Sequence, residues 1–104
     1  MEKSVIPKGW LRHMTKFEVR LHKRVLKYYR KSVEKTRKAL VEDFTLLEDN
    51  PFYYPGKIKQ LKGHAGLYRI ENAWLRSVYW IDPKEKIVHV ILILPRGDVY
   101  KKLD

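Results

Sequence analysis

The sequence predicts a single α+β domain in which two helices pack on one face of an antiparallel sheet. Three patterns along the chain lead to this prediction. A segment of alternating apolar and polar residues comes first, two stretches with helical spacing follow, and three stretches rich in β-branched and aromatic residues come last. A chain of 104 residues has room for one hydrophobic core and not for two. We therefore expect one domain over residues 14–104, preceded by an extension over residues 1–13.

The first strand is expected at residues 17–22, where the alternation has the period of a half-buried strand. From Lys23 onward the apolar spacing becomes helical. The apolar positions are Val25, Leu26 and Tyr29 in the first stretch and Val33, Leu40, Phe44 and Leu47 in the second. Ser32 lies between the stretches and is a candidate N-cap, which favours two helices over one bent helix.

The remainder of the chain has the composition of a loop followed by sheet. Residues 50–56 contain two prolines and a glycine and are expected to end the second helix. Residues 67–70, 75–82 and 87–94 are expected to be strands, and an Asp-Pro pair at 82–83 is typical of a turn. These strands should form a three-stranded antiparallel meander.

The charge of the chain points to a polyanionic partner. Lys and Arg number 23 against 12 Asp and Glu, which gives a formal net charge of +11. Such a field attracts nucleic acid or the ribosome more readily than acidic protein or an anionic membrane. A run of Lys and Arg on a helix is as often a solvated face as a grip on RNA, so the charge alone does not decide the function.

Several chemical classes are excluded by the composition. The sequence contains no cysteine, which rules out disulfides, thiolate metal sites and thiol nucleophiles. Its histidines lack the spacing of metal ligands, so no metal and no cofactor are expected. No apolar run approaches the roughly 20 residues that span a bilayer, and no signal peptide is evident. A cytoplasmic protein without a membrane partner is therefore expected.

Four short motifs follow one another along the second half of the chain. They are Leu61-Lys-Gly, Leu67-Tyr-Arg-Ile, Leu75-Arg-Ser-Val-Tyr and Leu94-Pro-Arg-Gly-Asp-Val-Tyr100. In order and spacing they resemble the RelE/ParE superfamily of toxins, over roughly residues 17–101, although no single motif is diagnostic. The resemblance implies the toxin of a type II toxin-antitoxin pair, a monomer that forms a complex with its cognate antitoxin.

The RelE branch of that superfamily implies a specific reaction. RelE-type toxins enter the ribosomal A site and cut messenger RNA without a metal, by attack of a ribose 2′-OH on the adjacent phosphate. The resemblance places the basic residues of this reaction on Arg69, Arg76 and Arg96, and its closing tyrosine on Tyr100. The chain departs from the pattern at Glu71, where the type member has a lysine that helps the tyrosine lose its proton. A second departure is a proline where relatives often carry histidine before the last arginine.

The strand pattern gives an independent reason to group these residues. A two-residue hairpin loop at residues 72–73 would place Arg69 directly opposite Arg76. In the same register Glu71 faces Trp74, so all four side chains lie on one side of the sheet. Like charges across a strand pair repel, and a phosphodiester between the guanidinium groups would relieve the repulsion. The alternative is that Glu71 simply neutralises a surface cluster.

Tyr100 is the preferred general base in this arrangement. An ordinary tyrosine has a pKa of about 10, so nearby cations such as Arg76 and Arg96 would have to lower it. Glu71 is the competing base, but the same arginines stabilise its charged form and make it a poor proton acceptor. A purely structural Tyr100, whose ring packs on the sheet edge, is the alternative.

Further substrate contacts are expected around these residues. The expected contacts are Lys62, His64, Trp74 and Lys101. Tyr53, Tyr54 and Trp80 could also stack on bases. His89 lies within an apolar strand and is expected in the core, and core packing is also the preferred role of Trp80.

Two other functions fit the same fold and charge. A ParE-like toxin shares the fold, binds DNA gyrase and does not cut RNA, but its members generally lack the set formed by Arg69, Arg76, Arg96 and Tyr100. A non-catalytic RNA-binding or ribosome-binding protein would use the same cations only to hold phosphates. Mapping of messenger cleavage on translating ribosomes separates these functions.

Overall fold

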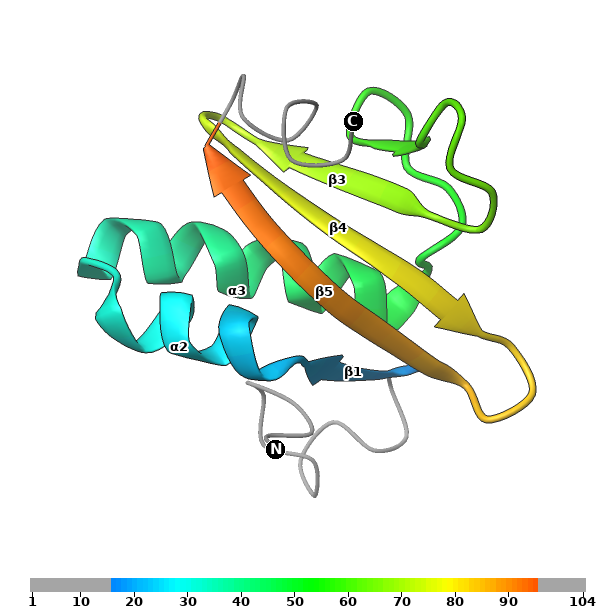
Figure 1. Cartoon of the computed structure of the whole chain (residues 1–104), viewed down its shortest axis with the longest axis horizontal. Helices are drawn as coiled ribbons and strands as arrows, with labels where there is room; N and C mark the ends of the chain where they lie inside the picture. The colour runs from blue at the N-terminus through cyan, green and yellow to red at the C-terminus, as the bar shows by residue number, and fades with distance from the viewer. Residues whose placement is uncertain (1–15, 96–104) are drawn as a thin grey trace.

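A computed structural model describes residues 16–95 of the chain and shows the expected α+β class, with two helices and a mixed sheet (Figure 1). Its elements are β1 (Glu18–Leu21), α2 (Lys23–Lys31), α3 (Glu34–Asp49), β2 (Ile58–Gln60), β3 (Tyr68–Asn72), β4 (Leu75–Asp82) and β5 (Ile87–Pro95). The predicted first strand, two helices and last three strands are thus confirmed in order. The expected extension over residues 1–13 lies outside the described residues.

The sheet has five strands in the order β1-β5-β4-β3-β2. β3, β4 and β5 form the predicted antiparallel meander, and β2 adds an antiparallel strand beside β3. β1 pairs with β5 in parallel, so the last strand within residues 16–95 lies inside the sheet. β2 was not predicted because its three residues are too few to show an alternation.

The two helices lie together on one face of the sheet, with α2 against β5 and β1 and α3 against β3 and β1 (Figure 1). The prediction that Ser32 caps the second helix was wrong. Its hydroxyl donates a 2.7 Å hydrogen bond back to the carbonyl of Tyr28 in α2, and α3 begins two residues later, at Glu34. Val33 then occupies the N-cap position with its side chain 69% exposed, outside the buried face to which it was assigned.

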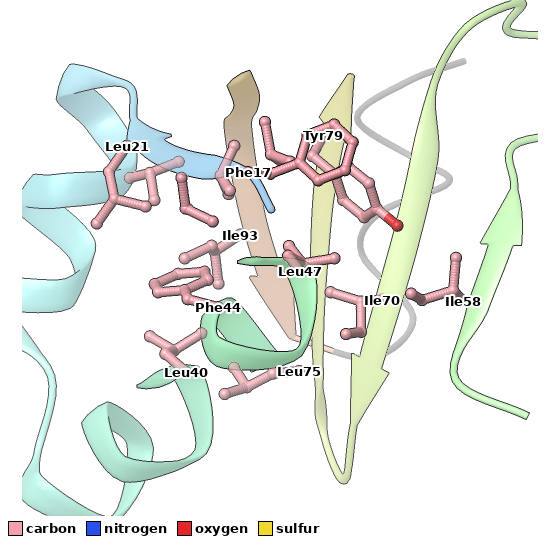
Figure 2. Packing of buried hydrophobic residues seen from close by; sticks show 14 residues of the cluster. Phe17, Leu21, Leu40, Phe44, Leu47, Ile58, Ile70, Leu75, Tyr79 and Ile93 are labelled. Atoms are coloured by element: carbon pink, nitrogen blue, oxygen red, sulfur yellow. The ribbon is translucent and has the colours of Figure 1, made fainter. Parts of the chain in front are cut away.

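The hydrophobic core fills the space between the helices and the sheet (Figure 2). Leu40, Phe44 and Leu47 of α3 are completely buried, and they belong to one cluster with Ile70 of β3 and Leu75 of β4. Each Leu or Phe of this kind contributes roughly 1.5–3 kcal/mol by burial, so this cluster is the main source of stability. Among the described residues, no helix has the length and apolarity needed to cross a membrane.

Tyr79 occupies the inward position in the middle of β4. Its ring is completely buried, and its hydroxyl donates a 2.7 Å hydrogen bond to the carbonyl of Pro51 in the loop after α3. Burial raises the pKa of Tyr79, and the neighbouring Tyr68 adds to the effect. Because successive strand residues point to opposite faces, Trp80 points outward and is 37% exposed. The prediction that Trp80 packs in the core was wrong for this reason.

A buried polar cluster of Asp43, Lys57 and Asn72 fastens the end of β3 to α3. The Asp43 carboxylate is completely buried and accepts hydrogen bonds of 3.2 Å from Lys57 Nζ and 3.2 Å from Asn72 Nδ2. Asn72 Nδ2 also lies 3.1 Å from the Ala39 carbonyl. Burial raises the pKa of Asp43, and the Lys57 ammonium partly offsets that rise. The cluster thereby fixes where the β3–β4 hairpin turns.

Candidate catalytic site

Three charged side chains meet on the outer face of the sheet, the face turned away from α2 and α3. Glu71 on β3 is paired directly with Arg76 on β4, and Arg69 lies two residues before Glu71 on the same side of β3. Glu71 Oε1 lies 3.0 Å from Arg69 Nη1, and Glu71 Oε2 lies 3.4 Å from Arg76 Nη2. We call these three residues the arginine cluster.

The shared face of Arg69, Glu71 and Arg76 was predicted correctly, but the register and the position of Trp74 on that face were wrong. The turn lies at residues 73–74, so Asn72 pairs with Leu75 and Arg69 pairs with Val78. Asn72 is held inside the strand by its hydrogen bonds to α3, and Ala73 takes the turn position with a φ of +55°. The two arginines therefore do not oppose each other directly.

Glu71 lies between the two arginines and partly neutralises them, as the alternative interpretation of the cluster expected. The arginine side chains are 11% and 10% exposed and that of Glu71 is 28% exposed, so the cluster is largely shielded from solvent. One carboxylate against two guanidinium groups leaves the cluster with a formal charge of +1. Its chemistry is that of an anion-binding site.

Arg76 has donor capacity that its contacts do not use. Its Nε is buried and has no hydrogen-bond partner among residues 16–95. The 3.4 Å contact to Glu71 is longer than a well-formed N–H···O hydrogen bond. A buried donor without a partner costs roughly 1–3 kcal/mol, which an incoming anionic oxygen would recover.

The arginine cluster lies beside the end of β5. Leu94 pairs with Arg76, and Pro95 pairs with Leu75. The next residue in the sequence is Arg96, which lies outside the described residues together with Tyr100 and Lys101. The roles assigned to these three residues therefore stay predictions.

The other expected substrate contacts lie at some distance from one another. Lys62 and His64 are in the connection between β2 and β3, which enters β3 at the opposite end from Glu71. Trp74 is at the tip of the β3–β4 hairpin and is 38% exposed. Lys35 Nζ of α3 lies 5.3 Å from the centre of its ring, a cation–π contact. The structure thus groups Trp74 with α3.

A second group on the outer face was not anticipated. Trp80 of β4 stacks on His89 of β5 with ring centres 4.1 Å apart and planes 10° apart, and His22 meets His89 edge-on at 5.7 Å. Desolvation lowers the pKa of His89, and the charges of His22 and Arg20 lower it further. His89 is half-buried and directed outward, so the expectation of a core histidine was wrong. The alternation of β4, with Tyr79 directed inward, was the signal that could have found this group.

A metal site is not formed by the part of the chain that the structure describes. No group of three or more His, Asp or Glu side chains there is arranged to hold an ion.

Comparison with known proteins gives a match in fold. No protein-family model and no curated protein sequence matches the chain. A chain of the archaeal RelE–RelB complex from Pyrococcus horikoshii OT3 matches with a TM-score of 0.69 and 25% identity, over 79% of this chain and 97% of that chain. The toxin-antitoxin complex RelBE2 from Mycobacterium tuberculosis gives a TM-score of 0.67 and 24% identity, over 82% and 97% of the two chains. A double mutant of the E. coli toxin RelE in the free state gives a TM-score of 0.65 and 24% identity, over 85% of this chain and 93% of that chain.

Proposed function

The chain has the fold of the RelE toxins, and on this premise we propose that it is the toxin of a type II toxin-antitoxin pair. We propose further that it is a metal-independent endoribonuclease that cuts messenger RNA on the ribosome in the cytoplasm. The P. horikoshii and M. tuberculosis neighbours come from RelE–RelB and RelBE2 complexes, which supports a cognate antitoxin as partner. An acidic segment of such an antitoxin would complement the net charge of +11.

The observation that carries the ribonuclease proposal is the arginine cluster. Two shielded guanidinium groups stand on one side of the sheet, and Arg76 Nε has no hydrogen-bond partner among the described residues. Guanidinium groups offer paired donors that match the oxygens of a phosphodiester. Charge grows on those oxygens as a fifth ligand approaches phosphorus, and donors held in place beforehand stabilise that charge. In this role the scissile phosphate competes with Glu71 for Arg69 and Arg76.

The proposed reaction is an internal transfer within the RNA. The ribose 2′-oxygen forms a bond to the adjacent phosphorus, and the bond from phosphorus to the 5′-oxygen of the next nucleotide breaks. Tyr100 receives the 2′ proton, helped by the cations of Arg76 and Arg96, and the leaving 5′-oxygen takes a proton from solvent. The products are a 2′,3′-cyclic phosphate and a free 5′-hydroxyl, and no step requires a metal.

The test is cleavage of a defined messenger on purified translating ribosomes, with mapping of the new ends. We expect wild type to cut, and Arg76→Met to cut about 10²–10³-fold more slowly, as for loss of one transition-state donor. Lys84→Met is the matched control because Lys84 is exposed in the β4–β5 turn, beyond the end of β4 that lies roughly 20 Å along the strand from Arg76. The control should cut like wild type.

Tyr100→Phe is the second arm of the test. It keeps the ring and removes the ionisable oxygen, so cleavage should fall about 10²–10⁴-fold while ribosome binding is unchanged. An active Arg76→Met variant would move the site away from the arginine cluster. Wild type that inhibits DNA gyrase and leaves messenger intact would instead establish the ParE-like function.

A further inference from the structure

Trp80 presents a large aromatic ring to solvent on the same sheet face as the arginine cluster. It is 37% exposed and stands four residues after Arg76 on β4, which places it roughly 13 Å away on the same side of the strand. The small apolar cluster of Leu61 and Val78 lies between the two sites. A few nucleotides of an extended strand could connect them.

The Trp80 ring is held in a fixed orientation. His89, directly opposite on β5, covers one face of the indole at 4.1 Å, and His22 supports His89 edge-on. Because the pKa of His89 is lowered, its imidazole is neutral near neutral pH, and contact between the two rings holds the stack together. A fixed ring loses little conformational entropy when another ring stacks on it. A nucleobase would stack on the face turned away from His89.

Cations surround this stack on the side of α2. A groove next to it is lined by His22, Lys23, Arg24 and Lys27, and Arg24 is fixed by a 2.7 Å hydrogen bond from its Nε to the Ile91 carbonyl.

Two acids lie near the stack. Glu18 pairs with Arg20 at 2.8 Å. The Asp82 carboxylate accepts hydrogen bonds from the backbone N–H groups of Lys84 and Glu85 in the β4–β5 turn and keeps a negative charge that acts on His89. The cations of the groove, Lys23, Arg24 and Lys27, outnumber these acids beside an aromatic ring, and this is the combination that binds single-stranded nucleic acid.

We propose that Trp80, held by His89, is a stacking platform for one nucleobase of single-stranded RNA, and that it sets the position of the strand relative to the arginine cluster. The proposal rests on the proposed function, since it assigns a second contact to the same RNA. It also predicts that the face turned away from His89 is the contact surface, and that removal of the ring weakens binding without removing a charge.

The test measures binding of a labelled uridine octamer to the free protein, without ribosomes, beside an abasic octamer with the same phosphates. Trp80→Leu should weaken binding of the uridine octamer about 5- to 100-fold, as stacking of one base contributes roughly 1–3 kcal/mol. Its affinity for the abasic octamer should equal that of wild type. Phe52→Leu is the matched control because Phe52 is an aromatic residue 45% exposed in the loop after α3.

The outcomes separate this inference from the proposed function. A Trp80→Leu variant that binds both octamers like wild type overturns the stacking platform, while cleavage by wild type on ribosomes would leave the proposed function standing. Equal weakening toward both octamers would also overturn it, because the loss would then not depend on a base. A wild type without measurable affinity for either octamer overturns the platform and leaves only the ribosome assay to judge the proposed function. A variant that loses affinity only for an antitoxin assigns Trp80 to a protein interface and overturns the inference.

Discussion

The two faces of the sheet differ in the balance of their buried charges. On the face covered by the helices, one carboxylate meets one cation: Asp43 Oδ1 accepts hydrogen bonds from Lys57 and Asn72, and among the described residues Asp43 Oδ2 has no partner. On the outer face, one carboxylate serves two arginines, and Arg76 Nε has no partner among the described residues. The covered face thus joins equal and opposite charges, whereas the outer face has one cation in excess and a free donor that an anion could use. The predictions below test this difference.

The largest effect on stability is expected from breaking the pair on the covered face. Lys57→Met leaves a buried carboxylate without its cation, and we expect the free energy of unfolding at neutral pH to fall by about 3 kcal/mol. Urea unfolding followed by circular dichroism measures it. Lys59→Met, two residues later in β2 and exposed, is the control and should change stability by less than about 0.5 kcal/mol. An equal loss in both variants would show that Asp43 is not held by Lys57.

A smaller loss of stability is expected from Tyr79→Phe. This change removes the hydroxyl that donates to the Pro51 carbonyl and leaves that carbonyl without its partner, which costs roughly 1–3 kcal/mol. Tyr68→Phe is the matched control, because the Tyr68 ring stacks on Tyr79 and its hydroxyl accepts a 3.3 Å hydrogen bond from the exposed Gln60 amide. In thermal unfolding, Tyr79→Phe should therefore have a lower melting temperature than Tyr68→Phe. The reverse order would contradict a stabilising role for the hydrogen bond from Tyr79 to Pro51.

On the outer face, loss of a charge should alter binding. Glu71→Gln removes the carboxylate from the arginine cluster. Affinity for a uridine octamer at low salt should rise, since the phosphate no longer competes with a carboxylate. Glu85→Gln, exposed in the β4–β5 turn, changes the net charge equally and should raise affinity less. Weaker RNA binding by Glu71→Gln would instead give Glu71 a direct part in holding the substrate.

The smallest effect concerns the pH dependence of stability. The pKa of His89 is lowered below its ordinary 6.5, so the unfolded chain takes up a proton before the folded chain as the pH falls. The contribution of His89 is present above pH 6.5 and is lost as the pH falls toward the lowered pKa.

Asp43 has the opposite sign. Its pKa is raised above 3.8, so its contribution to stability is present below that value and is lost as the pH rises through the raised pKa.

Because the contribution of His89 is lost on acidification, the fall in melting temperature from about pH 7 to about pH 5 should be smaller in His89→Gln than in wild type. His64→Gln is the control, and an unchanged slope in His89→Gln would contradict the burial argument.

Periodicity predicted the order of strand, two helices and meander because each of those elements buries one face. The side of the sheet on which Arg69, Glu71 and Arg76 lie also followed from alternation. The register did not, because it depends on hydrogen bonds from Asn72 to α3, residues distant in sequence. Ser32 was misjudged because its hydroxyl bonds within α2 instead of to the next helix.

The position of β5 has a consequence for synthesis of the protein. It is the last described strand in the chain, yet it lies between β1 and β4, and in the described sheet β1 has no other partner. A nascent chain that ends before Ile87 lacks the strand that joins the two ends of the sheet, so its central contacts form late. The arginine cluster would then be supported on only one side of β4. For the toxin proposed above, the arginine cluster would in this way stay incomplete until most of the chain has been synthesised.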